Sequence, residues 1–173
     1  NLIAMAFMVS LGVASATVVR VSIARGRGDT ADLRLAGWTG LGVNIVFMGL
    51  IGVMFVSVPA VLASAYTNDP AVIAIAVGLI AFCGIVVVAD GGQAVMVNAL
   101  RGSGGIWSPA IIQTFAYVVV LIPLGWYLGI HLGIGAIGLY QATLIASVVS
   151  LSSLSARFYW ISRQGIPEGA NNG

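Results

Sequence analysis

The chain alternates long apolar stretches with short polar or turn-forming breaks, and this pattern predicts its elements. The apolar stretches predict five helices, at residues 2–24, 35–65, 71–100, 108–128 and 133–158. Each has at least about 20 residues, which is enough to cross a hydrocarbon core of about 30 Å at about 1.5 Å per residue. We therefore predict an all-α membrane protein, a bundle of five transmembrane helices.

Two valine triplets, at residues 86–88 and 118–120, have high β-propensity but do not change this prediction. They lie inside longer apolar stretches that lack the alternation of apolar and polar residues expected of a membrane barrel. The 23 glycines are spread along the apolar stretches. Small residues allow helices in a membrane bundle to approach each other closely.

Composition excludes several classes of protein. Of the 173 residues, 60% are hydrophobic and 7% are charged, whereas soluble domains average about 25% charged residues. A water-soluble monomer and a disordered chain are therefore excluded. One cysteine, Cys83, and one histidine, His131, exclude an intramolecular disulfide, a cysteine zinc cluster and a histidine pair. We expect no enzyme activity, no cofactor and, at a net charge of +2, no nucleic-acid partner.

The distribution of arginine predicts the orientation in the membrane. The basic residues lie at alternate connections between the apolar stretches, or after the last of them: Arg20, Arg25, Arg27, Arg34, Arg101, Arg157 and Arg163. By the positive-inside rule these ends and the C-terminus are cytoplasmic. The absence of lysine suggests a GC-rich genome, and hence a multi-pass protein of a bacterial inner (plasma) membrane.

Asp90 is the main candidate for a functional residue, because it lies inside a predicted transmembrane helix. An acidic group at mid-bilayer costs roughly 2.5–3.5 kcal/mol, and such groups commonly mark ion pathways. Gln93 lies on the same helix face, and Gly91 and Gly92 between them loosen the helix and favour exposed carbonyl oxygens. The oxygen-rich cluster suits Na⁺ or a proton. The alternative is a structural carboxylate that a neighbouring helix caps.

Other polar residues within the apolar stretches could line a cavity or join helices by hydrogen bonds. They are Asn44, Asn98, Gln113, Tyr117 and Gln141. Gln113 and Tyr117 are four residues apart on one helix face, and for them we favour helix joining. Pro123 frees a backbone carbonyl and predicts a kink in the helix that contains it.

Three motifs in order resemble the MATE (multidrug and toxic compound extrusion) exporters. The first is the Arg-Val pair and Gly-rich turn of residues 20–29. The second joins Asp90-Gly91-Gly92-Gln93 to the Leu-Arg-Gly-x-Gly of residues 100–104 and to Pro109. The third is the Pro-Leu-Gly sequence that begins at Pro123. The Asp-x-x-Gln form is similar to the C-terminal lobe of the NorM-type branch.

The resemblance implies a place within a larger fold. MATE proteins have twelve helices in two lobes, and the five predicted helices resemble helices 8–12. Residues 1–160 would form part of the C-terminal lobe, and residues 161–173 a cytoplasmic tail. We expect the chain to be a piece of a longer protein, with helix 7 and the N-terminal lobe as its missing partners.

The family also implies a mechanism in which inward movement of Na⁺ or H⁺ drives export of small organic, often cationic, compounds. Asp90 matches the acidic residue on the tenth helix of NorM-type members, so the expected cation site is Asp90 with Gln93, and no other metal site is expected. Val86 stands where an aromatic residue is common, and the glutamate of helix 7 is absent. Arg20 and Arg101 are expected to stabilise the cytoplasmic helix ends.

Two other functions compete with export. A lipid-linked oligosaccharide flippase of the same superfamily would be expected to carry basic residues at its helix centres, and this chain has none. A non-transporting membrane assembly protein would have no reason to bear the free-energy cost of Asp90.

Overall fold

The computed structural model describes residues 2–67, 69–131 and 136–164, and no strand occurs within these ranges. The elements are α1 (Leu2–Gly26), α2 (Thr30–Ser57), α3 (Pro59–Ser64), α4 (Pro70–Gly102), α5 (Trp107–Phe115), the π-helical η1 (Ala116–Leu121), α6 (Ile122–Trp126), the π-helical η2 (Tyr127–His131) and α7 (Ala136–Gln164). Five spans of the described chain are long and apolar enough to cross a membrane. The predicted fold class is confirmed.

Aspartate caps fix where two of the long helices begin. The Asp29 carboxylate accepts a hydrogen bond from the backbone N–H of Asp32 at 2.9 Å, and Asp69 does the same for Ala71. An N-cap of this kind satisfies a backbone donor that the first helical turn leaves unpaired. As a result α2 begins at Thr30, five residues before the predicted start at residue 35, and takes polar residues into its first turn.

The helix predicted over residues 35–65 is in fact two helices. Val58 leaves the helical region, with φ −131° and ψ 45°, and Pro59 begins α3. Proline lacks a backbone N–H and its ring clashes with the preceding turn, so it ends a helix or starts a new one. The prediction of one continuous helix was wrong because it gave Pro59 no weight.

The span from Trp107 to His131 is continuous but not uniform. Two π-helical segments, η1 and η2, flank the short α6 that contains Pro123. Within it the backbone N–H of Ile122 bonds the carbonyl of Tyr117, five residues earlier. Such wide turns occur mostly as local insertions in α-helices. The structure therefore has widened turns on both sides of Pro123.

The last helix, α7, runs to Gln164, six residues beyond its predicted end at residue 158. The described part of the predicted tail, residues 161–164, is thus helical. Residues 133–135, where the helix was predicted to begin, and residues 165–173 of the tail lie outside the described residues.

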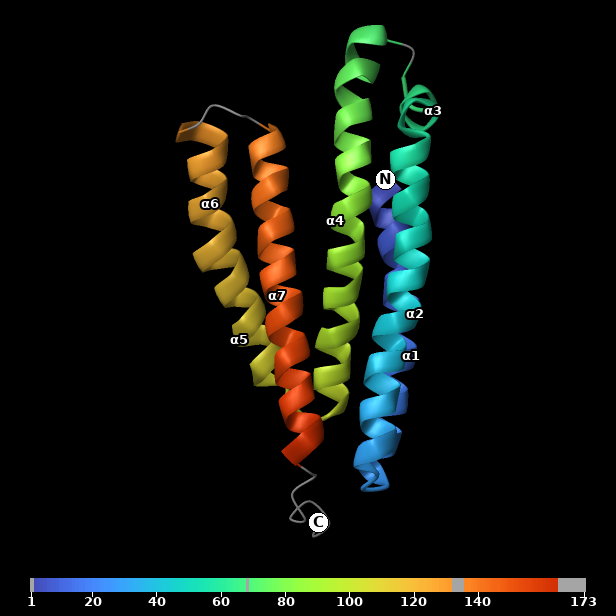
Figure 1. Cartoon of the computed structure of the whole chain (residues 1–173), viewed down its shortest axis with the longest axis vertical. Coiled ribbons are helices and arrows are strands. Elements are labelled where there is room, and N and C mark those ends of the chain that lie inside the picture. The colour runs from blue at the N-terminus through green and yellow to red at the C-terminus, as the bar shows by residue number, and fades with distance from the viewer. Residues whose placement is uncertain (1, 68, 132–135, 165–173) are drawn as a thin grey trace.

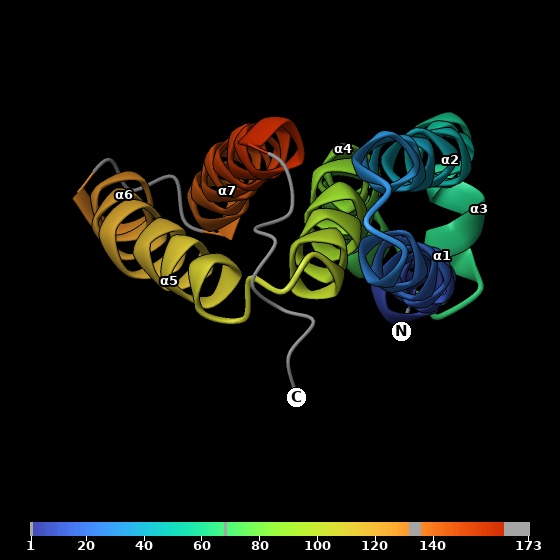
Figure 2. The ribbon, with the colours of Figure 1, turned by 90° about the horizontal axis from the view of Figure 1, so that it is seen from below.

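The helices are arranged around α4, which packs against α1, α2 and α7 (Figure 1). Seen from below, α1 and α2 lie on one side of α4, and α7 with the α5–α6 span lies on the other (Figure 2). The main core cluster joins α1, α2, α4 and α7 through buried side chains that include Val21, Leu33, Met96 and Phe158. The α6 and α7 ribbons diverge from α4 towards the upper end of Figure 1.

Glycine allows α2 and α4 to cross closely. A Cβ atom on Gly52 would lie 2.4 Å from the carbonyl oxygen of Gly84, and one on Gly84 would lie 2.7 Å from that of Gly52. Real side chains do not tolerate such contacts, so each helix presents bare backbone to the other. This reciprocal pair illustrates why small residues are frequent in membrane helix interfaces.

Candidate functional site

Asp90 lies in α4 on the side that meets α7. Its Oδ1 atom accepts a hydrogen bond of 2.5 Å from the hydroxyl of Ser147, a fully buried residue of α7. A length of about 2.5–2.7 Å is typical of a hydroxyl bound to an ionised carboxylate. The two helices that enclose the carboxylate are therefore joined through it.

Gln93, one turn after Asp90, makes a second link across the bundle. Its Nε2 atom donates a hydrogen bond of 3.1 Å to the hydroxyl of Tyr117, which lies in η1. The side chain is only 5% exposed, and its Oε1 atom is buried without a hydrogen-bond partner in the described part of the chain. The amide nitrogen of Gln93 is therefore hydrogen-bonded to Tyr117, and its amide oxygen is available to bind another group.

Gly91, which follows Asp90 in α4, faces α1 and α2. Its carbonyl accepts a hydrogen bond of 3.0 Å from the Ser10 hydroxyl. A Cβ atom on Gly91 would lie 2.8 Å from Cγ of Met48 and 2.9 Å from Nδ2 of Asn44. The glycine is needed here because two neighbouring helices approach its backbone directly.

Asn44 is fully buried beside this glycine, and neither atom of its amide has a hydrogen-bond partner among the described residues. An unpaired buried polar group usually lowers stability by about 1–3 kcal/mol. Local packing therefore gives no reason for a polar side chain at Asn44.

Four other helical segments each bring one polar side chain to a single turn of α4. We call this set the polar layer: Ser10, Asn44, Asp90, Gln93, Tyr117 and Ser147. Four of its members are predicted from the sequence, whereas Ser10 and Ser147 are not. A transmembrane serine commonly bonds a carbonyl of its own helix, as Ser15 and Ser152 do here, so its sequence position carries no signal.

The remaining predicted lining residues lie elsewhere. Asn98 donates to the carbonyl of Ala94 in its own helix at 2.9 Å. Gln113 and Gln141 are half-buried, and neither side chain makes a hydrogen bond within the described ranges. An open apolar groove of about 560 Å³ lies between α2, α4 and α7, but none of these three residues lines it. Their role in lining a substrate path stays a prediction.

The donor set of the polar layer fits a hard monovalent cation. It combines the Asp90 carboxylate with the oxygen atoms of Ser147, Tyr117 and Gln93, and the Gln93 oxygen is buried and unpaired. Hard cations prefer such oxygen ligands. No group of three or more His, Cys, Asp or Glu side chains that could hold a metal ion occurs in the described part of the chain.

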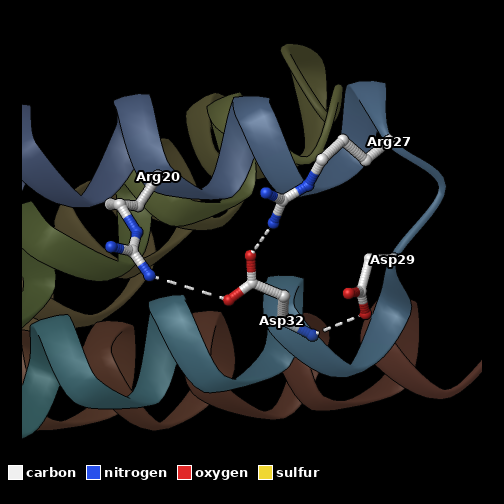
Figure 3. Close-up of polar contacts among 4 residues, drawn as sticks. All are labelled: Arg20, Arg27, Asp29 and Asp32. Carbon is white, nitrogen blue, oxygen red and sulfur yellow. Dashed lines mark hydrogen bonds and ion pairs between the residues drawn. The ribbon is translucent and has the colours of Figure 1, made fainter.

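A second charged cluster lies at the other end of α1, where it meets α2 (Figure 3). Asp32 accepts a hydrogen bond from Arg27 and lies 3.7 Å from Nη2 of Arg20. Arg101 is exposed and makes no ion pair within the described residues. The stabilising role of Arg20 and Arg101 stays a prediction.

Arg25 was missed as a link at this same end. A Cβ atom on Gly104 would lie 1.2 Å from Nη1 of Arg25, so the guanidinium rests against the turn between α4 and α5. Gly104 has a φ of +87°, in the region that glycine adopts without strain. The conformation therefore favours glycine at this position, whereas the contact is with the flexible end of the Arg25 side chain.

The chain is similar in sequence to known membrane proteins. The family model MatE matches residues 1–127. The chain is 35% identical to the probable multidrug resistance protein NorM of Caulobacter vibrioides, over 98% of this chain and 37% of that protein. It is 36% identical to the protein of the same name from Mesorhizobium japonicum, over 92% of this chain and 35% of that protein.

A solved structure shares the fold. The crystal structure of the eukaryotic MATE transporter AtDTX14 superimposes with a TM-score of 0.84, over 94% of this chain and 38% of that one, at 18% sequence identity. At this identity the likeness concerns the fold alone. The chain thus spans a little over one third of the length of the proteins it matches.

Proposed function

The chain belongs to the MatE family, and from this premise we propose that it forms part of a cation-coupled exporter of small organic, often cationic, compounds. The relatives named as multidrug resistance proteins support the export of drugs or toxic compounds. Because the chain spans only about 37% of the first relative, we propose that transport also needs the N-terminal lobe and helix 7.

The observation that carries the proposal is the carboxylate of Asp90 inside a transmembrane helix, bound by Ser147 of a second helix. A carboxylate at this depth costs roughly 2.5–3.5 kcal/mol. A hydrophobic residue would avoid this cost, so a role in binding Na⁺ or H⁺ accounts for the residue. The free Oε1 atom of Gln93 on the next turn adds a suitable ligand.

The charge of Asp90 also gives a physical reason for coupling. A bound cation neutralises the carboxylate and so stabilises arrangements in which water is excluded from it. Release of the cation restores the charge and stabilises arrangements in which water or a cationic substrate reaches the site. A cation gradient across the membrane can therefore drive the two arrangements in turn, since the cation binds them unequally.

We propose that the ends of α1 and α4 that carry Arg25, Arg27 and Arg101 face the cytoplasm of a bacterial cell. The positive-inside rule supports this orientation, and the two NorM relatives described above come from bacteria. No helix centre carries a basic side chain, so nothing in the polar layer suits the pyrophosphate of a lipid-linked oligosaccharide.

Efflux measurements with the full-length protein test the proposal. Asp90→Asn removes the charge and keeps the shape, so efflux of a fluorescent organic cation driven by a Na⁺ or H⁺ gradient should fall at least about tenfold. Asp69→Asn is the matched control, because Asp69 caps α4 outside the bilayer and asparagine is an equally good cap. Undiminished efflux in Asp90→Asn at equal membrane abundance would reduce Asp90 to a structural residue.

A further inference from the structure

We propose that the Ser147 hydroxyl is a ligand of the coupling cation, and that Na⁺ bound there joins α7 to α4. The proposal rests on the proposed function, because it takes Asp90 as the place where the cation binds. It adds a residue from a helix that no motif of the sequence connects with the site.

The Ser147 hydroxyl lies directly against the Asp90 carboxylate. Ser147 Oγ lies 2.5 Å from Oδ1 of Asp90, and the serine is fully buried. A metal cation that contacts this carboxylate oxygen on the side that faces α7 therefore also lies close to the serine oxygen. No other hydroxyl on α7 contacts a carboxylate among the described residues.

The Ser147 hydroxyl can act as a donor or as an acceptor. A serine side chain has one donor hydrogen and two acceptor lone pairs, and rotation about its Cβ–Oγ bond exchanges them. A cation on Asp90 repels the hydroxyl hydrogen and attracts the lone pairs. The hydroxyl can thus turn from a donor to Asp90 into a ligand of the cation while the backbone of α7 stays in place.

Tyr117 and Gln93 supply further oxygen atoms to the polar layer. Tyr117 accepts the Nε2–H of Gln93, which leaves the Oε1 atom of Gln93 buried and without a partner. These groups come from α4 and η1, whereas Ser147 comes from α7. A cation held by Asp90 and Ser147, with Gln93 and Tyr117 beside them, would therefore link three segments of the bundle.

The location of the link explains why Ser147 would matter for transport. The α6 and α7 ribbons diverge from α4 towards one end of the molecule (Figure 1). The hydrogen bonds Ser147–Asp90 and Gln93–Tyr117 join α4 to α7 and to η1. Exchange of a hydrogen bond for a shared cation at this level changes how firmly α7 is held against α4.

The chain contains a matched control residue on the same helix. Ser150 lies three residues after Ser147 and is also fully buried, but its hydroxyl has no hydrogen-bond partner in the described part of the chain. Replacement of either serine by alanine removes the same atom from α7, at positions only about 4.5 Å apart along the helix axis. Only replacement of Ser147 removes an oxygen that touches Asp90.

The experiment measures stabilisation by Na⁺ of the purified full-length protein in lipid nanodiscs, with choline replacing Na⁺ at constant ionic strength. A ligand that binds only the folded state raises the melting temperature as its concentration exceeds its Kd. For Ser147→Ala we expect the Na⁺ concentration at half-maximal stabilisation to rise at least about tenfold. Ser147→Thr, which keeps the hydroxyl, and Ser150→Ala should retain the wild-type value.

The outcomes separate the two proposals. A wild-type Na⁺ response in Ser147→Ala overturns the role of Ser147 while the proposed function stands. An equal loss of response in Ser150→Ala also overturns it, since the effect would then come from packing of α7. A protein without any Na⁺ response contradicts Na⁺ ligation by Ser147. A full response in Asp90→Asn would instead contradict the proposed function.

Discussion

The ion-paired end of α1 carries more charges than the polar layer, but the two regions are not expected to contribute to stability in proportion to their charges. The end of α1 and the start of α2 carry Arg20, Arg27 and Asp32 in an ion-paired cluster (Figure 3). The polar layer has one charged group, Asp90, held by a hydroxyl. We expect the layer with fewer charges to have the larger effect on both stability and function.

The surroundings explain the difference. The Arg20 side chain is 67% exposed and that of Asp32 is 21% exposed, so water and salt screen their attraction and the pair contributes at most about 1 kcal/mol. Where water is excluded within the bilayer, none can replace a lost partner. The effect of a polar group there on stability depends on whether it has a hydrogen-bond partner. Each polar atom of the polar layer is therefore expected to affect stability.

The largest effect on stability is expected from filling the space at Gly91. In Gly91→Val, the Cβ atom alone would lie less than 3 Å from Cγ of Met48 and Nδ2 of Asn44, so these buried side chains, or the helix α2 that carries them, must move. We expect severe loss of folded protein, measured as monodisperse yield after detergent extraction. Gly42→Val is the control, because a Cβ atom on Gly42 meets nothing within 4 Å. Equal yields of the two variants would contradict the close packing of the polar layer.

A smaller effect of opposite sign is expected at Asn44. Its buried amide lacks partners, so Asn44→Leu removes an unpaired polar group and should stabilise the protein by about 1–3 kcal/mol. The measurement is the melting temperature in nanodiscs. A lower melting temperature would show that the amide finds a partner, and would make Asn44 a working member of the polar layer.

The comparison also shows what the sequence could and could not predict. Five spans and the shared face of Asp90 and Gln93 follow from hydropathy and helical periodicity alone. Ser147 does not, because five serines lie between residues 147 and 155, and most transmembrane serines satisfy themselves on their own helix. Which of them meets Asp90 depends on how α7 is rotated against α4, and tertiary packing decides that rotation.

Proline shows the same limit in the fold. Pro59 separates two helices, whereas Pro123 lies within a continuous span that adopts π-helical turns around it. The residue type is the same in both places. The outcome depends on whether nearby backbone groups find other partners, as the N–H of Ile122 does on the carbonyl of Tyr117.

The smallest effect on stability is expected at the ion-paired end of α1. Arg20 lies 3.7 Å from Asp32 and is largely exposed, so Arg20→Gln should lower stability by less than about 0.5 kcal/mol, half the upper limit for an exposed pair. The melting temperature should change little, and the small change should vanish in about 1 M salt, where the Debye length falls to about 3 Å. Asp90→Asn should behave differently in a salt without Na⁺, because a buried group is screened much less than an exposed pair. If Arg20→Gln destabilised the protein as strongly as changes in the polar layer do, the end of α1 would hold the lobe together. Exposure would then be a poor guide to the energetic weight of a charge in this chain.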